Sequence, residues 1–336
     1  MKVCIYGAGA IGGFIGTRLA VAGSCTVAAV ARGATLRALQ QHGWRLRQGG
    51  SLLQAPARAS DDAHELGPMD LVVLAVKGPA LAEVAPRIAP LLGPETLVLP
   101  AMNGVPWWFA ASTPALQDAP LRSVDPDGRL GRHIPLAQVI GCVVHASTFT
   151  PEPGLVEQRM GQGLIIGEPL GGASPRAQRL GELLRGAGFD TTVSTDIRQD
   201  IWYKLWGNMT MNPVSAITGA SVDRIMADPL VLAFCTAAMQ EAAAVGARIG
   251  CAVAQSADDR HAVTRKLGSF RTSMQNDVDA GRAIELDALV TVVREIAQRL
   301  GLATPNIDAL LGLTRLFARV RGLYPEEDVP AGRVRT

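Results

Sequence analysis

Residues 1–19, MKVCIYGAGAIGGFIGTRL, decide the fold of the N-terminal half. A short apolar run at residues 3–6 leads into glycines with the G-x-G-x-x-G spacing, followed by a stretch typical of a helix. In a Rossmann dinucleotide-binding unit, Gly7 would allow the tight turn, Gly9 would admit a pyrophosphate, and Gly12 would let helix and strand pack closely. A purely structural glycine turn, the alternative, explains the third glycine poorly. We therefore predict a dinucleotide-binding turn made of Gly7, Ala8, Gly9, Ala10, Ile11 and Gly12.

The end of the second strand, predicted at residues 26–31, indicates which dinucleotide the turn binds. NAD-binding units usually carry an acid about 20 residues past the glycine motif, where it holds the ribose 2′-hydroxyl. Here the strand is followed by Arg32, and residues 13–49 contain no Asp or Glu. A guanidinium suits a phosphate group. We therefore predict NADP(H), bound through Arg32; the alternative is that Arg32 is an ordinary solvated arginine.

Composition limits the class of protein. A length of 336 residues suggests about two domains. The net charge of +2 gives no support for a nucleic-acid or membrane-surface partner. The five cysteines are scattered, as expected for a reduced, cytoplasmic protein, and the five histidines give no support for a metal site. The apolar stretch at residues 225–247 is interrupted by polar residues, so we expect no membrane-spanning helix.

The first half of the chain alternates strand and helix patterns, as in a parallel sheet with covering helices. A buried strand at residues 70–76 is followed by Lys77, and a strand at residues 96–100 is followed by Asn103, with a helix predicted between them at residues 80–92. Ligands bind at the carboxyl ends of such strands, so we expect Lys77 and Asn103 to meet cofactor or substrate. Residues 118–135 are predicted to form a surface loop, with a lid as the alternative.

Strand patterns continue at residues 139–150, 154–159, 164–167 and 191–193, and residues 196–321 are almost entirely helical in pattern. We therefore predict an α/β fold in which a Rossmann-type dinucleotide-binding domain at residues 1–194 precedes an all-helical domain at residues 195–323. Residues 324–336 are expected to be a loose tail. The apolar stretch at residues 231–245 would suit a homodimer interface as well as a core.

A predicted helix at residues 196–212 carries Lys204, Asn208 and Asn212 at i, i+4 and i+8, which puts all three on one face. Pro213 is expected to end or kink this helix. A solvated polar stripe, the alternative, would normally hold several charges. One lysine and two asparagines in an otherwise apolar segment favour a functional site, because such groups are costly to bury without partners.

A second polar cluster comprises Ser269, Ser273 and Asp277, spaced four residues apart, and then Glu285 and Asp287. The spacing predicts that the first three share a helix face. The two acids are expected at the start of the next helix, where the helix dipole favours carboxylates. A capping role, the alternative, suits Asp287 better than Glu285.

These motifs together resemble the ketopantoate reductase (2-dehydropantoate 2-reductase) family over nearly the whole chain. The resemblance rests on GAGAIG at residues 7–12, Lys77, Asn103-Gly104, the K-x-x-x-N-x-x-x-N-P run at residues 204–213, Ser273-Met274-x-x-Asp277, and Glu285-x-Asp287. It implies NADPH-dependent reduction of ketopantoate, a 2-oxo acid, to D-pantoate on the route to pantothenate and coenzyme A. It also implies that the helical domain resembles the C-terminal domain of 6-phosphogluconate dehydrogenase.

The resemblance further implies roles for individual residues. Lys204 would be the general acid, Glu285 would bind substrate and help to order the lysine, and Asn103 would lie beside the nicotinamide. Asn208, Asn212 and Ser273 would hold the substrate.

Departures from the family pattern concern the substrate more than the reaction. Ile284 stands where the family often has Thr, Met102 where a polar residue is common, and Val290-Thr291 where Asn-Gly is frequent. A related NADP-dependent reductase of another 2-oxo acid is therefore the main alternative. A catalytically silent NADP-binding sensor is a weaker one, because both Lys204 and Glu285 are present.

Overall fold

The computed structural model describes residues 1–116 and 119–326, and the chain forms two compact units. The first comprises Met1–Leu205 and Gly246–Val253, and the second comprises Trp206–Val245 and the residues from Ala254 onward. The last strand ends at Ser194, where we expected the first domain to end, but the first unit continues to Leu205. Lys204, which was predicted in the helical domain, therefore belongs to the first unit.

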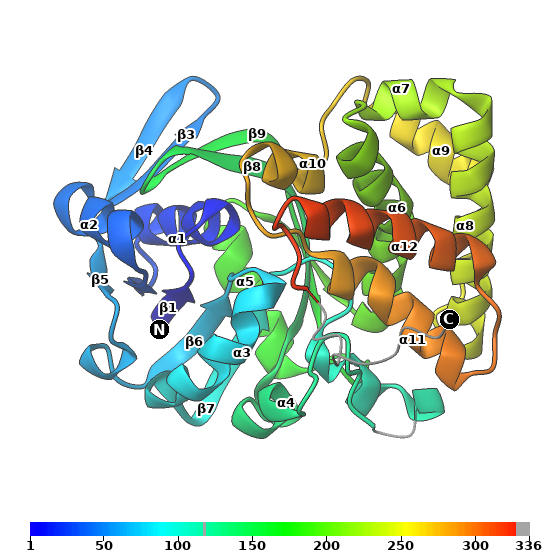
Figure 1. The fold of residues 1–336 in the computed structure, drawn as a ribbon. Helices are drawn as coiled ribbons and strands as arrows, with labels where there is room; N and C mark the ends of the chain where they lie inside the picture. The colour runs from blue at the N-terminus through cyan, green and yellow to red at the C-terminus, as the bar shows by residue number, and fades with distance from the viewer. Residues whose placement is uncertain (117–118, 327–336) are drawn as a thin grey trace. The chain divides into compact units, whose positions relative to one another are not determined.

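The first unit is built on a parallel five-stranded sheet in the order β5-β2-β1-β6-β7 (Figure 1). The strands are β1 (Lys2–Tyr6), β2 (Thr26–Val30), β5 (Arg58–Ser60), β6 (Met69–Leu74) and β7 (Leu92–Pro100). The chain runs from β1 to β2 on one side and later returns to β6 on the other. The carboxyl end of β1 is therefore the topological switch point, where open α/β sheets bind ligands.

Glycines shape the turn at this switch point, between β1 and helix α1 (Ala10–Ala22). Gly7 has a φ of +93°, a conformation that favours glycine. A Cβ atom on Gly12 would lie 2.0 Å from the carbonyl oxygen of Gly7, so only glycine allows this close approach of helix and turn. The predicted strand, glycine turn and helix are confirmed.

A second sheet completes the first unit, in the order β10-β9-β3-β4 with β8 paired to β9. Its strands are β3 (Trp44–Gln48), β4 (Ser51–Ala55), β8 (Gly141–Glu152), β9 (Leu155–Gly167) and β10 (Asp190–Ser194). The β3–β4 hairpin was not predicted, because Arg45 and Arg47 alternate with the apolar residues of β3 and make its sequence pattern polar. Two strands were predicted where β9 runs unbroken.

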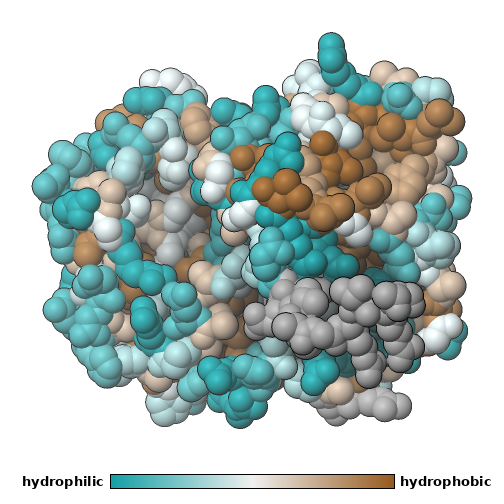
Figure 2. Space-filling view, in the orientation of Figure 1, coloured by the Kyte–Doolittle hydropathy of each residue, from teal (hydrophilic) through white to brown (hydrophobic). Residues whose placement is uncertain are grey.

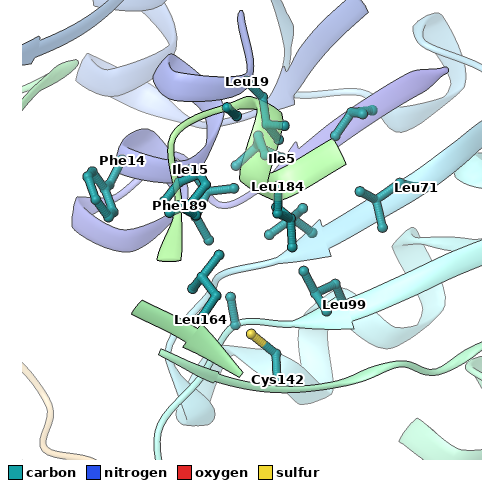
Figure 3. Packing of buried hydrophobic residues seen from close by; sticks show 14 of the residues in the cluster. Ile5, Phe14, Ile15, Leu19, Leu71, Leu99, Cys142, Leu164, Leu184 and Phe189 are labelled. Atoms are coloured by element: carbon teal, nitrogen blue, oxygen red, sulfur yellow. The ribbon is translucent and has the colours of Figure 1, made fainter. Parts of the chain in front are cut away.

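One core joins α1 to both sheets (Figure 3). Ile5 of β1, Ile15 of α1 and Leu164 of β9 are all fully buried within it. Phe14 of α1 packs edge-on against Phe189, with ring centroids 5.3 Å apart. This packing fixes the N-terminal end of α1, and hence the glycine turn, against a rigid support.

The remaining helices of the first unit are short. They are α2 (Gly33–His42), α3 (Leu81–Val84), α4 (Arg129–His133) and α5 (Pro175–Gly186), with 3-10 turns η1 (Ala63–Glu65), η2 (Gly78–Ala80), η3 (Ala85–Arg87), η4 (Ala89–Leu91), η5 (Trp107–Ser112), η6 (Pro114–Leu116) and η7 (Leu136–Gln138). The prediction of one helix over residues 80–92 is wrong. Pro86 and Pro90 have no N–H to donate, and they break the segment into α3, η3 and η4.

The predicted loop at residues 118–135, described from residue 119 onward, contains ordered structure. Asp125 is buried and accepts hydrogen bonds from the backbone N–H groups of Leu130 (3.0 Å) and Gly131 (3.1 Å) in α4. Residue 118 lies outside the described residues. An aspartate buried at its centre ties the segment together, so it is a folded connection.

The second unit is helical (Figure 1). Its elements are the later part of α6 (Ile197–Thr218), then α7 (Val222–Ala227), α8 (Pro229–Arg248), α9 (Ala257–Lys266), α10 (Ser273–Asp279), the π-helical turn η8 (Asp287–Thr291), α11 (Val292–Arg299) and α12 (Pro305–Val320). Its core includes Val214, Cys235 and Leu310. This architecture confirms the predicted fold class, an α/β unit combined with a helical one.

Two expectations for the helical part need correction, the first of them only in the outcome that the helix ends at Pro213. Pro213 does not end α6, which continues to Thr218. Val214 and Ser215 beyond it are buried, so packing outweighs the one backbone hydrogen bond that proline removes. The loose tail was expected to begin at residue 324. Tyr324 is instead anchored, because its hydroxyl donates to Asp287 Oδ1 at 2.5 Å. Residues 327–336 lie outside the described part of the chain.

Helix α8 is long and apolar enough to cross a membrane by length and composition, contrary to the expectation that no segment would be. A core helix passes the same test. Cys235 and Met239 of α8 are buried, and Glu241 accepts hydrogen bonds from the N–H groups of Asn306 and Ile307 at the start of α12. These contacts tie α8 into the second unit.

Candidate functional site

A cavity of about 200 Å³ opens at the carboxyl ends of β1 and β2. Its lining combines the glycine turn with the end of β2 and includes Tyr6, Gly7, Ala8, Gly9, Arg32, Thr35, Asp61 and Arg87. A Cβ atom on Gly9 would meet nothing within 4 Å, so the turn leaves space for a ligand. No side chain caps the N-terminus of α1, and its first turn carries no acid. The backbone N–H groups there are therefore available to an anion such as a pyrophosphate.

Arg32 lies at this cavity, where the sequence predicted it. It is the N-cap residue of α2, its side chain is 57% exposed, and its Nη1 is 3.5 Å from Glu83 Oε2. Exposed ion pairs at this distance contribute little. Arg32 is therefore positioned at the end of β2 without being committed to a strong internal partner.

Sequence reasoning missed several residues of the cavity, among them Tyr6, Asp61 and Arg87. Parallel pairing of β2 with β5 sets Ser60 opposite Val30, which brings Asp61 to the end of β2, 29 positions after Arg32 in the chain. The search for an acid covered only the residues near β2 in sequence. Asp61 directly follows β5, but its position after a strand points to the cavity only once β5 is known to pair with β2.

Lys204 and Asn103 meet in the first unit. The Lys204 Nζ donates to Asn103 Oδ1 at 2.7 Å and to the backbone carbonyl of Val144 at 2.6 Å. Asn103 belongs to the loop after β7, where Gly104 has a φ of +83°, and Val144 belongs to β8. Both acceptors are neutral oxygens. They fix the position of the ammonium group without cancelling its charge.

Lys204 lies close enough to the buried thiol of Cys142 for its charge to act on the pKa of that thiol. Cys142, two residues before Val144 on β8, is buried, and burial raises the pKa of its thiol to about 12 although the charge of Lys204 lowers it. The thiol therefore stays neutral. Trp202, two residues before Lys204 on α6, is also buried. A half-buried ammonium interacts strongly with any negative charge that develops near it.

The remaining predicted residues belong to both units. Lys77 is half-buried at the carboxyl end of β6, where it precedes η2. Asn208 and Asn212 follow Lys204 along α6; Asn208 is half-buried and Asn212 is buried. Asn208 and Asn212 belong to the second unit, as do Ser273 and Glu285.

Within the second unit, hydrogen bonds join α10 to the C-terminal part of α6. The hydroxyls of Thr272 and Ser215 are 2.5 Å apart, and Gln275 Nε2 donates to the carbonyl of Gly219 at 2.7 Å. Thr272 also caps α10, and Ser273 follows it as an exposed residue. The structure therefore places Ser273 on an element that is attached to the helix of Asn212.

Two details of the second cluster differ from the prediction. Ser269 precedes α10 in an irregular connection, so it does not share a helix face with Ser273 and Asp277. Glu285 lies in extended chain just before η8 and is half-buried. Asp287 begins η8 and accepts from the hydroxyls of Thr291 and Tyr324, which is a structural role.

No three His, Cys, Asp or Glu side chains gather as a metal site within residues 1–116 and 119–326. The five cysteines are free thiols.

Family models match both parts of the chain. A model described as "Ketopantoate reductase PanE/ApbA" matches residues 3–171, and one described as "Ketopantoate reductase PanE/ApbA C terminal" matches residues 196–318. The two matches cover most of the sequence and confirm the resemblance that the motifs indicated.

Curated relatives agree with the family models. The chain is 42% identical over 325 residues to a 2-dehydropantoate 2-reductase of Mesorhizobium japonicum, covering 96% of this chain and 100% of the relative. It is 25% identical to a 2-dehydropantoate 2-reductase of Halobacterium salinarum, covering 95% and 99%.

Solved structures share the fold. A candidate ketopantoate reductase from Ralstonia solanacearum MolK2 is 54% identical, with a TM-score of 0.92 over 96% of this chain and 99% of that one. A D-mandelate dehydrogenase with NADH and anilino(oxo)acetate is 20% identical, with a TM-score of 0.82 over 96% and 100%. This second likeness concerns the fold alone.

Proposed function

This chain belongs to the ketopantoate reductase family, and we propose that it catalyses the NADPH-dependent reduction of 2-dehydropantoate (ketopantoate) to D-pantoate. The reaction belongs to pantothenate and coenzyme A biosynthesis, and we place it in the cytoplasm. The observation that carries the proposal is the Lys204–Asn103 contact at 2.7 Å, which holds an ammonium group at the carboxyl end of the parallel sheet.

The residues of the first unit fit a dinucleotide. The positive φ of Gly7, the open space at Gly9 and the uncapped N-terminus of α1 suit a pyrophosphate, and Arg32 suits a 2′-phosphate. Lys77 and Asn103 follow neighbouring parallel strands and would contact the cofactor near its nicotinamide end. When bound, the cofactor supplies the hydride.

Lys204 acts as the general acid. Reduction of a ketone builds negative charge on its oxygen, and a positioned ammonium both stabilises that charge and donates the proton. Asn103 Oδ1 and the Val144 carbonyl hold the ammonium in place, which limits the reorganisation needed during the reaction. Support for this role comes from the geometry around Lys204 and from the family pattern.

The second unit holds the substrate. Asn208 and Asn212 offer amide donors on α6, and Ser273 offers a hydroxyl on the attached α10; these groups can bind a carboxylate or hydroxyl without adding charge. Glu285 is proposed to bind a substrate hydroxyl, the role that the family pattern implies.

A related reductase of another 2-oxo acid is the second candidate. Ile284, next to Glu285, is buried and has no hydroxyl, whereas the family often has Thr at this position. Asp61 could also accept a bond from a ribose hydroxyl, which would favour NADH. Steady-state NADPH and NADH oxidation with ketopantoate and a panel of 2-oxo acids separates the candidates. We expect the highest kcat/KM for NADPH with ketopantoate; a higher value for another acid would reject the substrate, and a preference for NADH would reject the cofactor.

The partners in this proposal are the cofactor and a small 2-oxo acid, and neither a nucleic acid nor a membrane has a role in it. The chain is proposed to act as a homodimer. Leu313, Leu316 and Val320 recur on one side of α12 and are 60%, 62% and 75% exposed. Figure 2 shows apolar residues on the surface of the second unit. Such a stripe can be covered by a second copy.

A further inference from the structure

The face of β1 opposite α1 carries a feature that the mechanism above does not use. Alternate residues of a strand point to opposite faces. Val3 and Ile5 lie in the core with α1, so Cys4 and Tyr6 face the other side of the sheet. Tyr6 is the last residue of the strand, and it lines the cavity at the glycine turn. Tyr6 therefore lines the cavity from the face of the sheet opposite to α1.

The segment after β6 supplies a second arginine to the same cavity. Proline breaks this segment into short turns, and η3 ends at Arg87, which lines the cavity with Tyr6 and Arg32. Arg87 is exposed, and it makes no hydrogen bond or ion pair with other residues in the described ranges 1–116 and 119–326. An arginine in this position is available to a ligand of the cavity.

Both guanidinium groups act on the phenol of Tyr6. Burial raises the pKa of Tyr6, whereas the charges of Arg87 and then Arg32 lower it. Arg87 and Arg32 also line the same cavity as Tyr6, although the two arginines come from segments 55 positions apart.

We propose that Arg87 is a second cation of the 2′-phosphate subsite, where it binds the same phosphate as Arg32, with the Tyr6 hydroxyl as a donor between them. The inference rests on the proposed use of NADP(H). A 2′-phosphate carries nearly two negative charges, which one shared arginine balances poorly. Arg32 is also paired with Glu83, and Asp61 adds a negative charge to the cavity. A second guanidinium brings the cations to two, equal in number to the two carboxylates, and gives a 2′-phosphate a second positively charged donor that a free ribose hydroxyl does not need.

The test is an Arg87→Gln variant of the full chain, titrated calorimetrically with NADPH, NADH, 2′,5′-ADP and 5′-AMP. We expect weaker binding of NADPH and 2′,5′-ADP by about 10-fold, the loss of one hydrogen bond to a charged group. NADH and 5′-AMP should bind as in the wild type. Arg179→Gln is the matched control, because Arg179 is an exposed arginine on α5 away from the cavity lining. Arg87→Lys should restore part of the loss.

Two results would overturn the assignment. Equal losses for NADPH and NADH would mean that Arg87 contacts the pyrophosphate or supports the fold, and unchanged binding of all four ligands would remove it from the site. Failure of the proposed cofactor looks different: the wild type itself would bind NADH as tightly as NADPH. Thermal unfolding of Arg87→Gln should match the wild type, because Arg87 is exposed and makes no ion pair within the described part of the chain.

Discussion

At the scale of single residues, the candidate site depends on contacts between side chains that are far apart in sequence. Lys204 and Asn103 were both expected at the site from the motifs around them, and the structure joins them directly. Arg87 and Asp61 were not expected, because neither belongs to a local motif that is typical of a binding site. Their place follows from strand pairing and from the proline-broken path after β6, neither of which local sequence patterns reveal.

The Lys204–Asn103 contact can be tested from the asparagine side. Asn103→Ala removes one acceptor of the Lys204 ammonium and leaves the Val144 carbonyl. We expect kcat to fall by about 10-fold, the loss of one hydrogen bond to a charged group. Gln178→Ala, an exposed polar residue on α5, is the control. An unchanged kcat for Asn103→Ala would show that the contact does not position the ammonium for catalysis.

At the scale of elements, the sequence predicted those whose pattern is local and strong: β1, the glycine turn and α1, β6, and the long helix α6. It failed where distant packing decides the outcome. The β3–β4 hairpin forms because Trp44 and Leu46 are buried against α1, despite the arginines between them. The later part of α6 stays helical beyond Pro213 because the second unit buries it.

The glycine turn allows a prediction that separates folding from binding. Gly12→Ala places a Cβ atom 2.0 Å from the Gly7 carbonyl oxygen, so the turn must move and thermal stability should fall. Gly9→Ala meets nothing within 4 Å and has an ordinary φ of −78°. It should keep the wild-type melting temperature but bind NADPH and NADH equally poorly, because the methyl group occupies the space for the pyrophosphate. Wild-type affinity in Gly9→Ala would place the pyrophosphate elsewhere.

At the scale of the whole molecule, buried thiols predict the response of stability to alkaline pH. Burial raises the pKa of Cys4, Cys142 and Cys251 to about 12, compared with 9 for an ordinary thiol. The folded state therefore holds these protons while the unfolded chain loses them, so stability is full below pH 9 and falls as the pH rises toward 12.

Chemical unfolding at pH 8 and pH 10 measures this effect. Cys142→Ala removes one buried thiol, and its loss of unfolding free energy between the two pH values should be smaller than that of the wild type by about 1 kcal/mol. Cys25→Ala is the comparison, because Cys25 is only partly buried and should change the pH dependence less. Identical pH dependence in wild type and Cys142→Ala would mean that this thiol ionises in the folded state.

We propose that the Lys204 ammonium, which donates to Asn103 and to the Val144 carbonyl, gives the proton to the reduced carbonyl oxygen. The most direct measurement is the single-turnover rate of NADPH oxidation with ketopantoate in Lys204→Ala, with the Kd for NADPH measured on the same sample and Lys266→Ala, an exposed lysine at the end of α9, as control. We predict a rate lower by about 100-fold or more, the scale for losing a general acid, with NADPH affinity retained. A rate equal to that of the wild type would contradict the claim.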